Sequence, residues 1–175
     1  MELKIKRLSD KAIMPIRAHE GDAGLDLTTT SITSEINECG QFILVYHSDI
    51  AVEIPDGYVG LLFPRSSIAK KSIQFTNAVG VIDSGYRGEI MAKVRNTSGD
   101  SVPAVYKVGE KFAQLVIVPY VSDITITETT ELQDSDRGAG GYGSSDVKED
   151  ISAAKQSDAS EDKQAVEVET SETAA

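Results

Sequence analysis

The segment 80–88 contains the residues best suited to chemistry in this chain. It places one acid, Asp83, and one aromatic ring, Tyr86, on a bend framed by glycines. Glycine permits backbone conformations and close approaches that a Cβ would block. Bare backbone on such a bend can hydrogen-bond the edge of a flat ligand such as a pyrimidine, and Asp83 can deprotonate a nearby water. The simpler alternative is a tight hairpin with a hydrogen-bonded Asp, which would be preferred if the segment stood alone.

A second glycine-rich segment, 137–145, adds a cation, another ring and two hydroxyl groups. Its glycines could wrap a phosphate chain, Tyr142 could cover a base, and Arg137 could pair with a terminal phosphate. A flexible glycine linker is the simpler alternative. Together with segment 80–88, it indicates a polyphosphate joined to a planar group.

Asp26 belongs to a third cluster, at 21–27, where it stands between two leucines. This spacing predicts that its side chain projects away from the core, where a carboxylate could hold a metal-bound water near a phosphate. Alternatively, Asp22 and Asp26 simply shape a turn.

Two further clusters offer groups that suit a phosphate. Arg65, Ser66 and Ser67 open a predicted short helix at 66–73, which Ser66 would cap. An ordinary cap beside a solvated Arg65 explains them equally well. Gln114 is an amide within an apolar strand, so if buried it needs a partner. A phosphate oxygen or a neighbouring backbone group would serve.

The elements that must position these residues are predicted to be short β-strands. Segments of strand character lie at 1–8, 50–54, 58–63, 90–94, 113–118 and 124–127. Turn signals separate them at 55–57, 98–100 and 108–110. Many short strands at this spacing are typical of an all-β barrel or sandwich.

Length and composition narrow the class of protein. The 175 residues fit one domain, and we expect no membrane span and no signal peptide. The single Cys39 excludes an internal disulfide and favours a reducing, cytoplasmic location. His19 and His47 lie far apart, which makes a zinc site unlikely. The net charge of −11 argues against a nucleic-acid partner.

Residues 146–175 differ in composition from the rest of the chain. They contain nine acids and three lysines, a net charge of −6, with no aromatic residue, Leu, Gly or Pro. Such a segment cannot bury enough apolar surface to offset chain entropy. It is predicted to be disordered, or at most a fraying helix, and to act as a solubilising tail. A docking or regulatory role for an unknown partner is the alternative.

Taken in order, the five clusters resemble the five motifs of trimeric dUTP pyrophosphatases (dUTPases), from about residue 18 to residue 145. The resemblance implies an all-β fold, a distorted β-barrel or jelly roll with one short helix. It also implies a homotrimer in which all three subunits build each active site. The implied parts are a barrel domain at 1–136 and an arm at 137–145 that closes the site. The acidic tail at 146–175, predicted from its composition, lies outside the shared pattern.

The implied activity is Mg²⁺-dependent hydrolysis of dUTP to dUMP and pyrophosphate, which supplies dUMP for thymidylate synthesis and keeps uracil out of DNA. Asp83 would activate the water that attacks the α-phosphorus, and Asp26 would hold Mg²⁺ through water. The implied substrate-binding residues are Arg65, Ser66, Ser67, Asn77, Gly80, Val81, Ile82, Tyr86, Met91, Gln114, Arg137, Tyr142, Gly143 and Ser144.

Within that set, Tyr86 would pack on the deoxyribose and exclude ribonucleotides. Backbone groups near Asn77 and Met91 would read the uracil edge. The chain departs from the family pattern in three places: Ser67 stands where Gly is common, Tyr142 replaces Phe, and Ser145-Asp146 replaces Thr-Gly. Two alternatives are a dCTP deaminase, which shares the fold, and a dUTPase-like binding or signalling protein that uses its acidic tail.

Overall fold

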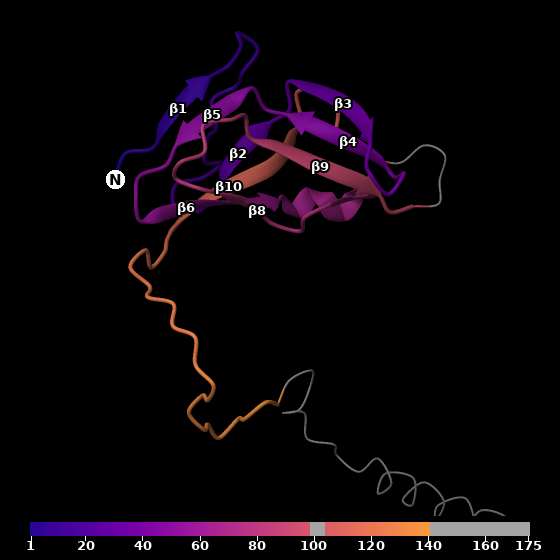
Figure 1. The fold of residues 1–175 in the computed structure, drawn as a ribbon. Helices are drawn as coiled ribbons and strands as arrows, with labels where there is room; N and C mark the ends of the chain where they lie inside the picture. The colour runs from indigo at the N-terminus through magenta and orange to yellow at the C-terminus, as the bar shows by residue number, and fades with distance from the viewer. Residues whose placement is uncertain (99–103, 141–175) are drawn as a thin grey trace, which may run out of the picture. The chain divides into compact units, whose positions relative to one another are not determined.

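A computed structural model describes residues 1–98 and 104–140 of the chain and is almost entirely β (Figure 1). Within these ranges, ten strands and one short 3-10 helix follow one another. Their bounds are β1 Lys4–Arg7, β2 Leu25–Thr28, β3 Ser31–Ile36, β4 Phe42–His47, β5 Ile50–Glu53, β6 Tyr58–Pro64, η1 Ser66–Lys70, β7 Ile73–Phe75, β8 Gly80–Ile82, β9 Met91–Asn96 and β10 Lys111–Pro119.

Eight of the described strands form two four-stranded sheets, ordered β2-β10-β6-β8 and β3-β4-β9-β7, while β1 pairs with β5. Every pairing is antiparallel. Neither four-stranded sheet closes on itself among the described strands. The predicted all-β jelly-roll class is therefore confirmed, with open sheets.

Apolar side chains from both sheets form one core. Phe112 and Leu115 of β10 and Tyr46 and Val94 of the second sheet are almost fully buried. The rings of Tyr46 and Phe112 stack with centroids 5.5 Å apart, which joins the two sheets directly. Because β10 runs through the middle of its sheet, its buried residues fix the neighbouring strands β2 and β6 that carry site residues.

Most of the strands predicted from the sequence are present. Strands β1, β5, β6, β9 and β10 coincide with predicted segments, and the turns at Gly57 and Gly109 have φ of +80° and +87°. Strands β2, β3, β4, β7 and β8 were not predicted. The strand predicted at 124–127 is wrong, since no described residue pairs with it. A strand needs a partner for its backbone hydrogen bonds, however well its side chains alternate.

The predicted helix is shorter than expected. It is a single 3-10 stretch, Ser66–Lys70, within the predicted 66–73. Arg65, in an extended conformation, occupies the N-cap position and no side chain caps the helix. The prediction that Ser66 caps the helix is therefore wrong, because Ser66 is already its first residue. The first closing bond runs from the Ile68 N–H to the Arg65 carbonyl, at 2.9 Å.

The chain divides into two units, with the boundary between residues 125 and 126. All the described strands lie in the first unit. The described part of the second unit, 126–140, contains a turn at 136–139. The acidic tail at 146–175 lies outside the described residues, and the domain boundaries at 136 and 145 stay predictions. No helix in the described ranges is long and apolar enough to cross a membrane.

Candidate active site

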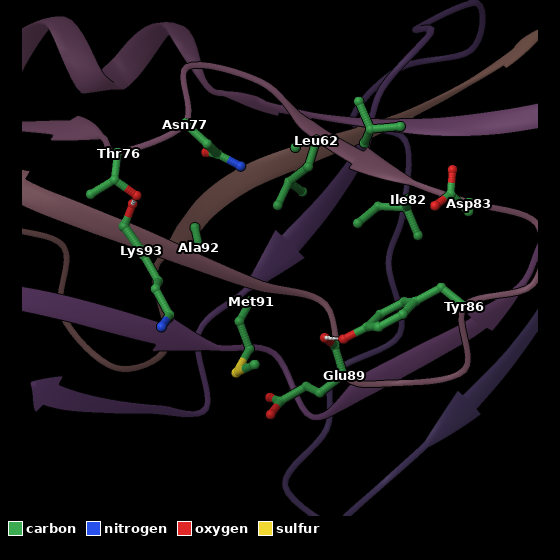
Figure 2. Close-up of a pocket in the computed structure, with 12 residues that line it drawn as sticks. Leu62, Thr76, Asn77, Ile82, Asp83, Tyr86, Glu89, Met91, Ala92 and Lys93 are labelled. Atoms are coloured by element: carbon green, nitrogen blue, oxygen red, sulfur yellow. Dashed lines mark hydrogen bonds between the residues drawn. The ribbon is translucent and has the colours of Figure 1, made fainter. Parts of the chain in front are cut away.

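A cavity of about 440 Å³ opens between β8 and β9 (Figure 2). The two strands follow each other in the sequence but belong to different sheets, because β8 pairs with β6 whereas β9 pairs with β4 and β7. The strands therefore do not pair with each other, and the segment that connects them, residues 83–90, is a hairpin loop between the two sheets. Seven of the predicted residues line the cavity: Asn77, Gly80, Val81, Ile82, Asp83, Tyr86 and Met91.

One wall of this cavity is an open strand edge. Among the described strands, β8 is the last of its sheet and pairs only with β6. Gly80 packs closely on that neighbour, since a Cβ at Gly80 would lie 3.1 Å from the Cβ of Leu62. The free side of an edge strand presents backbone N–H and C=O groups. Such groups can match the donors and acceptors on the edge of a flat ring.

Asp83 and Tyr86 lie at one end of the cavity and Asn77 and Lys93 at the other (Figure 2). The Tyr86 N–H donates to the Asp83 carbonyl at 3.0 Å, which closes a turn between them. Asp83 is exposed, and no described residue donates a hydrogen bond to its carboxylate. This carboxylate is therefore free to accept a bond from a water or a ligand.

The Tyr86 side chain folds back over its own hairpin. Its hydroxyl donates to the Glu89 carbonyl at 3.0 Å, as Figure 2 shows. The ring lies so close to Gly88 that a Cβ there would collide with the Tyr86 hydroxyl and ring edge. Tyr86 is still 41% exposed. Gly88 thus makes room for the ring while the ring keeps an open surface.

A second group of predicted residues surrounds Asp26 on β2. The Asp26 side chain is only 8% exposed, and Arg65 Nε donates to its Oδ1 at 2.7 Å. Lys111 Nζ donates to its Oδ2 at 2.8 Å. The adjacent Leu27 is fully buried, so Asp26 projects away from the core as predicted. Asp26 is in a strand, and only Asp22 shapes a turn, by accepting the His19 N–H at 2.9 Å.

This group lines a separate cavity of about 320 Å³, to which Asp26, Arg65, Ser66 and Gln114 contribute. The Gln114 amide donates to the Pro64 carbonyl at 3.1 Å. Of the two partners considered for Gln114, the structure thus provides the backbone group. Ser66 is exposed beside Arg65. The cavity offers an anion the guanidinium, hydroxyl and amide donors of these residues, beside the carboxylates of Asp22 and Asp26.

Ser67 faces a third cavity, of about 400 Å³, where its hydroxyl lies 2.9 Å from that of Tyr106. Lys71 lies over the Tyr106 ring, 4.8 Å from its centroid. The backbone N–H of Lys107 donates to the Glu110 carboxylate and, with Lys71 nearby, holds the pKa of Glu110 below its usual value. Lys70 of η1 and Lys111 of β10 line the same cavity, so cations extend beyond Arg65.

The first two cavities share no lining residue. Within one chain, Asp83 and Tyr86 therefore line a different cavity from Arg65 and Ser66. Arg137 lies in the second unit, where its Nε donates to the Gly140 carbonyl at 3.1 Å. The predicted residues Tyr142, Gly143 and Ser144 lie outside the described residues.

Two residues near the site were missed from the sequence. Glu89 lines the first cavity, and Lys111 pairs with Asp26 across 85 residues of chain. Glu89 directly follows the segment 80–88, and Lys111 belongs to the same segment, 109–115, as the predicted Gln114, so the only signal for either was its place beside predicted residues. Over the described ranges, no three His, Cys, Asp or Glu residues come together in a way that could hold a metal ion.

A family model for dUTPase matches residues 10–146. The chain belongs to the dUTPase family. The deoxyuridine 5'-triphosphate nucleotidohydrolase of Clostridium acetobutylicum is 41% identical over 151 residues, which cover 85% of this chain and 99% of the relative. That of Alkaliphilus metalliredigens is 42% identical over 149 residues, or 83% and 98% of the two chains.

Solved dUTPase structures agree with this assignment. A mutant dUTPase of Staphylococcus bacteriophage 80alpha with dUpNHpp has a TM-score of 0.67 and 32% identity, over 82% of this chain and 98% of that one. A mutant dUTPase from phage phi11 of S. aureus, described with a coordinated structural Mg(II) ion, has a TM-score of 0.62 and 30% identity. That match covers 77% of this chain and 100% of the phage protein.

Proposed function

We propose that this chain hydrolyses dUTP to dUMP and pyrophosphate in the cytoplasm. The observation that carries the proposal is the cavity between β8 and β9, which brings an unpartnered acid, Asp83, and an open ring, Tyr86, beside a free strand edge. This arrangement occurs within a chain of the dUTPase family. The cytoplasmic location is supported by the single, exposed Cys39.

The cavity has features that suit a uracil base and its sugar. Backbone groups of Gly80 and Val81, with Asn77 and Met91 facing them, would read the uracil edge, and Ile82 would line the space beside it. Tyr86 would lie against the deoxyribose with its exposed face. A ring held in contact with C2′ leaves no room for a 2′-hydroxyl, so UTP is excluded by shape.

Asp83 would act as the general base. Its carboxylate would take one proton from a water, whose oxygen forms a bond to the α-phosphorus. The bond between that phosphorus and the bridging oxygen would break, and its electron pair would leave on pyrophosphate. Phosphoryl transfer depends mainly on positioning and charge neutralisation, so Asp83 would act together with the groups that bind the phosphates.

The second group of residues would bind the phosphates. Arg65, Ser66, Ser67 and Gln114 offer the donors, and Asp26 would contact Mg²⁺ through water. The Asp26 oxygens already accept bonds from Arg65 and Lys111, so this carboxylate fits a water-mediated contact better than direct ligation. When bound, Mg²⁺ would neutralise charge on the triphosphate.

The complete site would need several subunits. Since the base cavity and the phosphate cavity share no lining residue, we infer that each site of a homotrimer joins the base cavity of one subunit to the phosphate cavity of another. The arm of a third subunit would close it, with Arg137 and Ser144 on the γ-phosphate, Tyr142 on uracil and Gly143 between them.

Subunit sharing can be tested by mixing two inactive variants. Asp83→Asn chains combined with chains truncated before Arg137 should recover part of the wild-type activity in mixed trimers, because some sites receive only intact parts. No recovery in verified mixed trimers would contradict the shared site.

Deamination of dCTP is less well supported. A deaminase would need a protonatable group at the base, and Glu89 is a carboxylate in the cavity lining. However, its two oxygens are bound to the Asp49 N–H and to His47. Asp83, in contrast, is open to a water. The cavity therefore favours hydrolysis at phosphorus.

The direct test is a nucleotide panel with pyrophosphate detection. Purified protein with Mg²⁺ should convert dUTP to dUMP and pyrophosphate and leave dTTP, dCTP and UTP almost untouched. Release of ammonia from dCTP would support the deaminase instead. Equal turnover of UTP and dUTP would remove Tyr86 from substrate selection.

A further inference from the structure

Glu89 anchors the hairpin that carries Asp83 and Tyr86 to the corner between β4 and β5. Its Oε1 accepts the backbone N–H of Asp49 at 2.8 Å, and its Oε2 lies 3.1 Å from Nδ1 of His47. The Glu89 side chain is 18% exposed and that of His47 is 21% exposed. Hydrogen bonds to an ionised group are stronger than neutral ones, and partial burial strengthens them further.

The corner that receives Glu89 is itself fixed from two directions. Nε2 of His47 lies 2.9 Å from the hydroxyl of Thr33 on β3. Asp49 has φ of +53°, an uncommon conformation for a residue other than glycine. The Ser9 hydroxyl donates to the Asp49 carboxylate at 2.6 Å. Glu89 is therefore bound to a rigid part of the fold.

The next residue, Ile90, is attached to the same corner. Its N–H donates to the Ile50 carbonyl at 2.8 Å, and its carbonyl accepts the Ser48 hydroxyl at 2.6 Å. Ile90 and Ser48 are fully buried. Four consecutive residues, 47–50, thus hold residues 89 and 90, and the hairpin leaves this fixed point toward the cavity.

The hairpin is held by bonds within it, since the Tyr86 N–H donates to the Asp83 carbonyl at 3.0 Å and the Arg87 guanidinium donates to the carbonyls of Ser84 and Tyr86. Residues 83–88 lie between β8 and β9 and belong to no strand. The Tyr86 hydroxyl bonds to the carbonyl of Glu89, the same residue whose carboxylate is anchored. Figure 2 shows the Tyr86 ring pointing toward Glu89. Any shift of residue 89 would therefore shift the ring as well.

We propose that Glu89, held by His47 and by the Asp49 amide, is a positioning residue that places the Tyr86 ring and thereby sets the discrimination between deoxyribose and ribose substrates. The proposal rests on the proposed function. Rejecting a substrate for one extra hydroxyl group requires the ring to hold its position, because a displacement of about 1 Å can change a rate by about a hundredfold.

The test compares kcat/KM for dUTP and for UTP in the wild type and in three variants. Glu89→Leu removes both side-chain bonds and should lower the dUTP-to-UTP ratio by roughly ten- to a hundredfold. Glu89→Gln should retain most of the ratio, since its carbonyl oxygen can accept the Asp49 N–H. Its amide can donate to Nδ1 of His47 when the imidazole proton is on Nε2. Asp49→Asn keeps the backbone donor and a side-chain acceptor for the Ser9 hydroxyl, and asparagine tolerates a positive φ, so this variant should behave like the wild type.

A second measurement does not depend on activity. Hydrogen exchange of amides in segment 84–88 should be faster in Glu89→Leu than in the wild type, and close to wild type in Glu89→Gln and Asp49→Asn. If Glu89→Leu does not fold, His47→Phe, which removes one of the two partners, is measured in the same way and should show a smaller change in both readouts.

The outcomes separate this proposal from the proposed function. A wild type that does not hydrolyse dUTP would defeat the function, whereas the exchange measurement would still report on the anchor. A folded Glu89→Leu protein with a wild-type ratio and wild-type exchange would overturn the positioning role. Equal losses for dUTP and UTP in Glu89→Leu would also overturn it, since a merely structural role changes both substrates alike.

Discussion

Asp83 and Asp26 are both predicted site carboxylates, yet the fold surrounds them in opposite ways. Asp83 is exposed on a hairpin outside any strand, and its carboxylate accepts no hydrogen bond from the described residues. The Asp26 side chain is 8% exposed, lies within β2, and accepts bonds from Arg65 and Lys111. The two acids thus share a residue type and differ in every contact.

The difference indicates that the two regions are prepared for ligand in different ways. The phosphate side, which is Asp26 with Arg65 and Lys111, is assembled in advance, because Asp26 holds both cations in place before any ligand arrives. The hairpin side leaves its acid open and controls only where the acid and the Tyr86 ring stand, through Gly88 and Glu89. The same substitution should therefore damage chemistry at one position and stability at the other.

The largest effect is expected for Asp83→Asn. Loss of the general base should reduce kcat for dUTP by roughly a hundred- to ten-thousandfold, with KM nearly unchanged. Since no described contact of the carboxylate is lost, the free energy of unfolding should stay within about 0.5 kcal/mol of wild type. Steady-state kinetics measure kcat and KM, and urea unfolding measures the free energy of unfolding. An undiminished kcat would remove Asp83 from the mechanism.

The second effect is expected for Gly88→Ala. A methyl group at this position collides with the Tyr86 ring, so the ring must move out of its place over the hairpin. The preference for dUTP over UTP should fall about tenfold or more. Gly85→Ala is the matched control, because a Cβ at Gly85 meets nothing within 4 Å. Equal behaviour of the two variants would contradict the packing role of Gly88.

The contrast between the two regions also shows what the sequence could predict. Segment 80–88 and Arg65 were found because glycine-framed acids and a cation before a helix are local patterns. The separation of β8 from β9 was not predictable, since it depends on which sheet each strand joins. The same holds for Glu89, whose partners His47 and Asp49 are 42 and 40 residues away.

Local patterns also misled in two places. The segment 124–127 alternates like a strand, but pairing rather than alternation decides whether a strand forms. Conversely, β4 is a run of mainly apolar residues without clean alternation, so it was missed, although Ile43, Val45 and Tyr46 are buried there. Burial alternates from Phe42 to Val45, but apolar side chains occupy both faces, so the sequence itself lacks the period of two that marks a strand with one polar face.

The third effect is expected for Asp26→Asn, and it should appear in stability. An amide cannot balance Arg65 and Lys111, which are 29% and 34% exposed and can turn partly toward water. We expect a loss of about 1–3 kcal/mol in the free energy of unfolding, at the lower end if solvent screens the two cations. Urea unfolding of Asp26→Asn and Asp83→Asn under the same conditions measures the difference directly. Equal free energies of unfolding for Asp26→Asn and Asp83→Asn would contradict the conclusion that Asp26 holds Arg65 and Lys111 in place before ligand binds.

The smallest effect is expected when the chain is truncated after Ser145. No predicted site residue follows Ser144, so kcat/KM for dUTP should stay within about twofold of the full chain at physiological salt, where exposed charges interact only over about 8 Å. A loss above tenfold would mean that the acidic tail takes part in the active site, together with the regions around Asp83 and Asp26.

If turnover survives but a binding partner of the full chain is lost, residues 146–175, with their net charge of −6, act as a docking element. In that case the regions around Asp83 and Asp26 carry the catalytic activity, and the tail has a separate binding function.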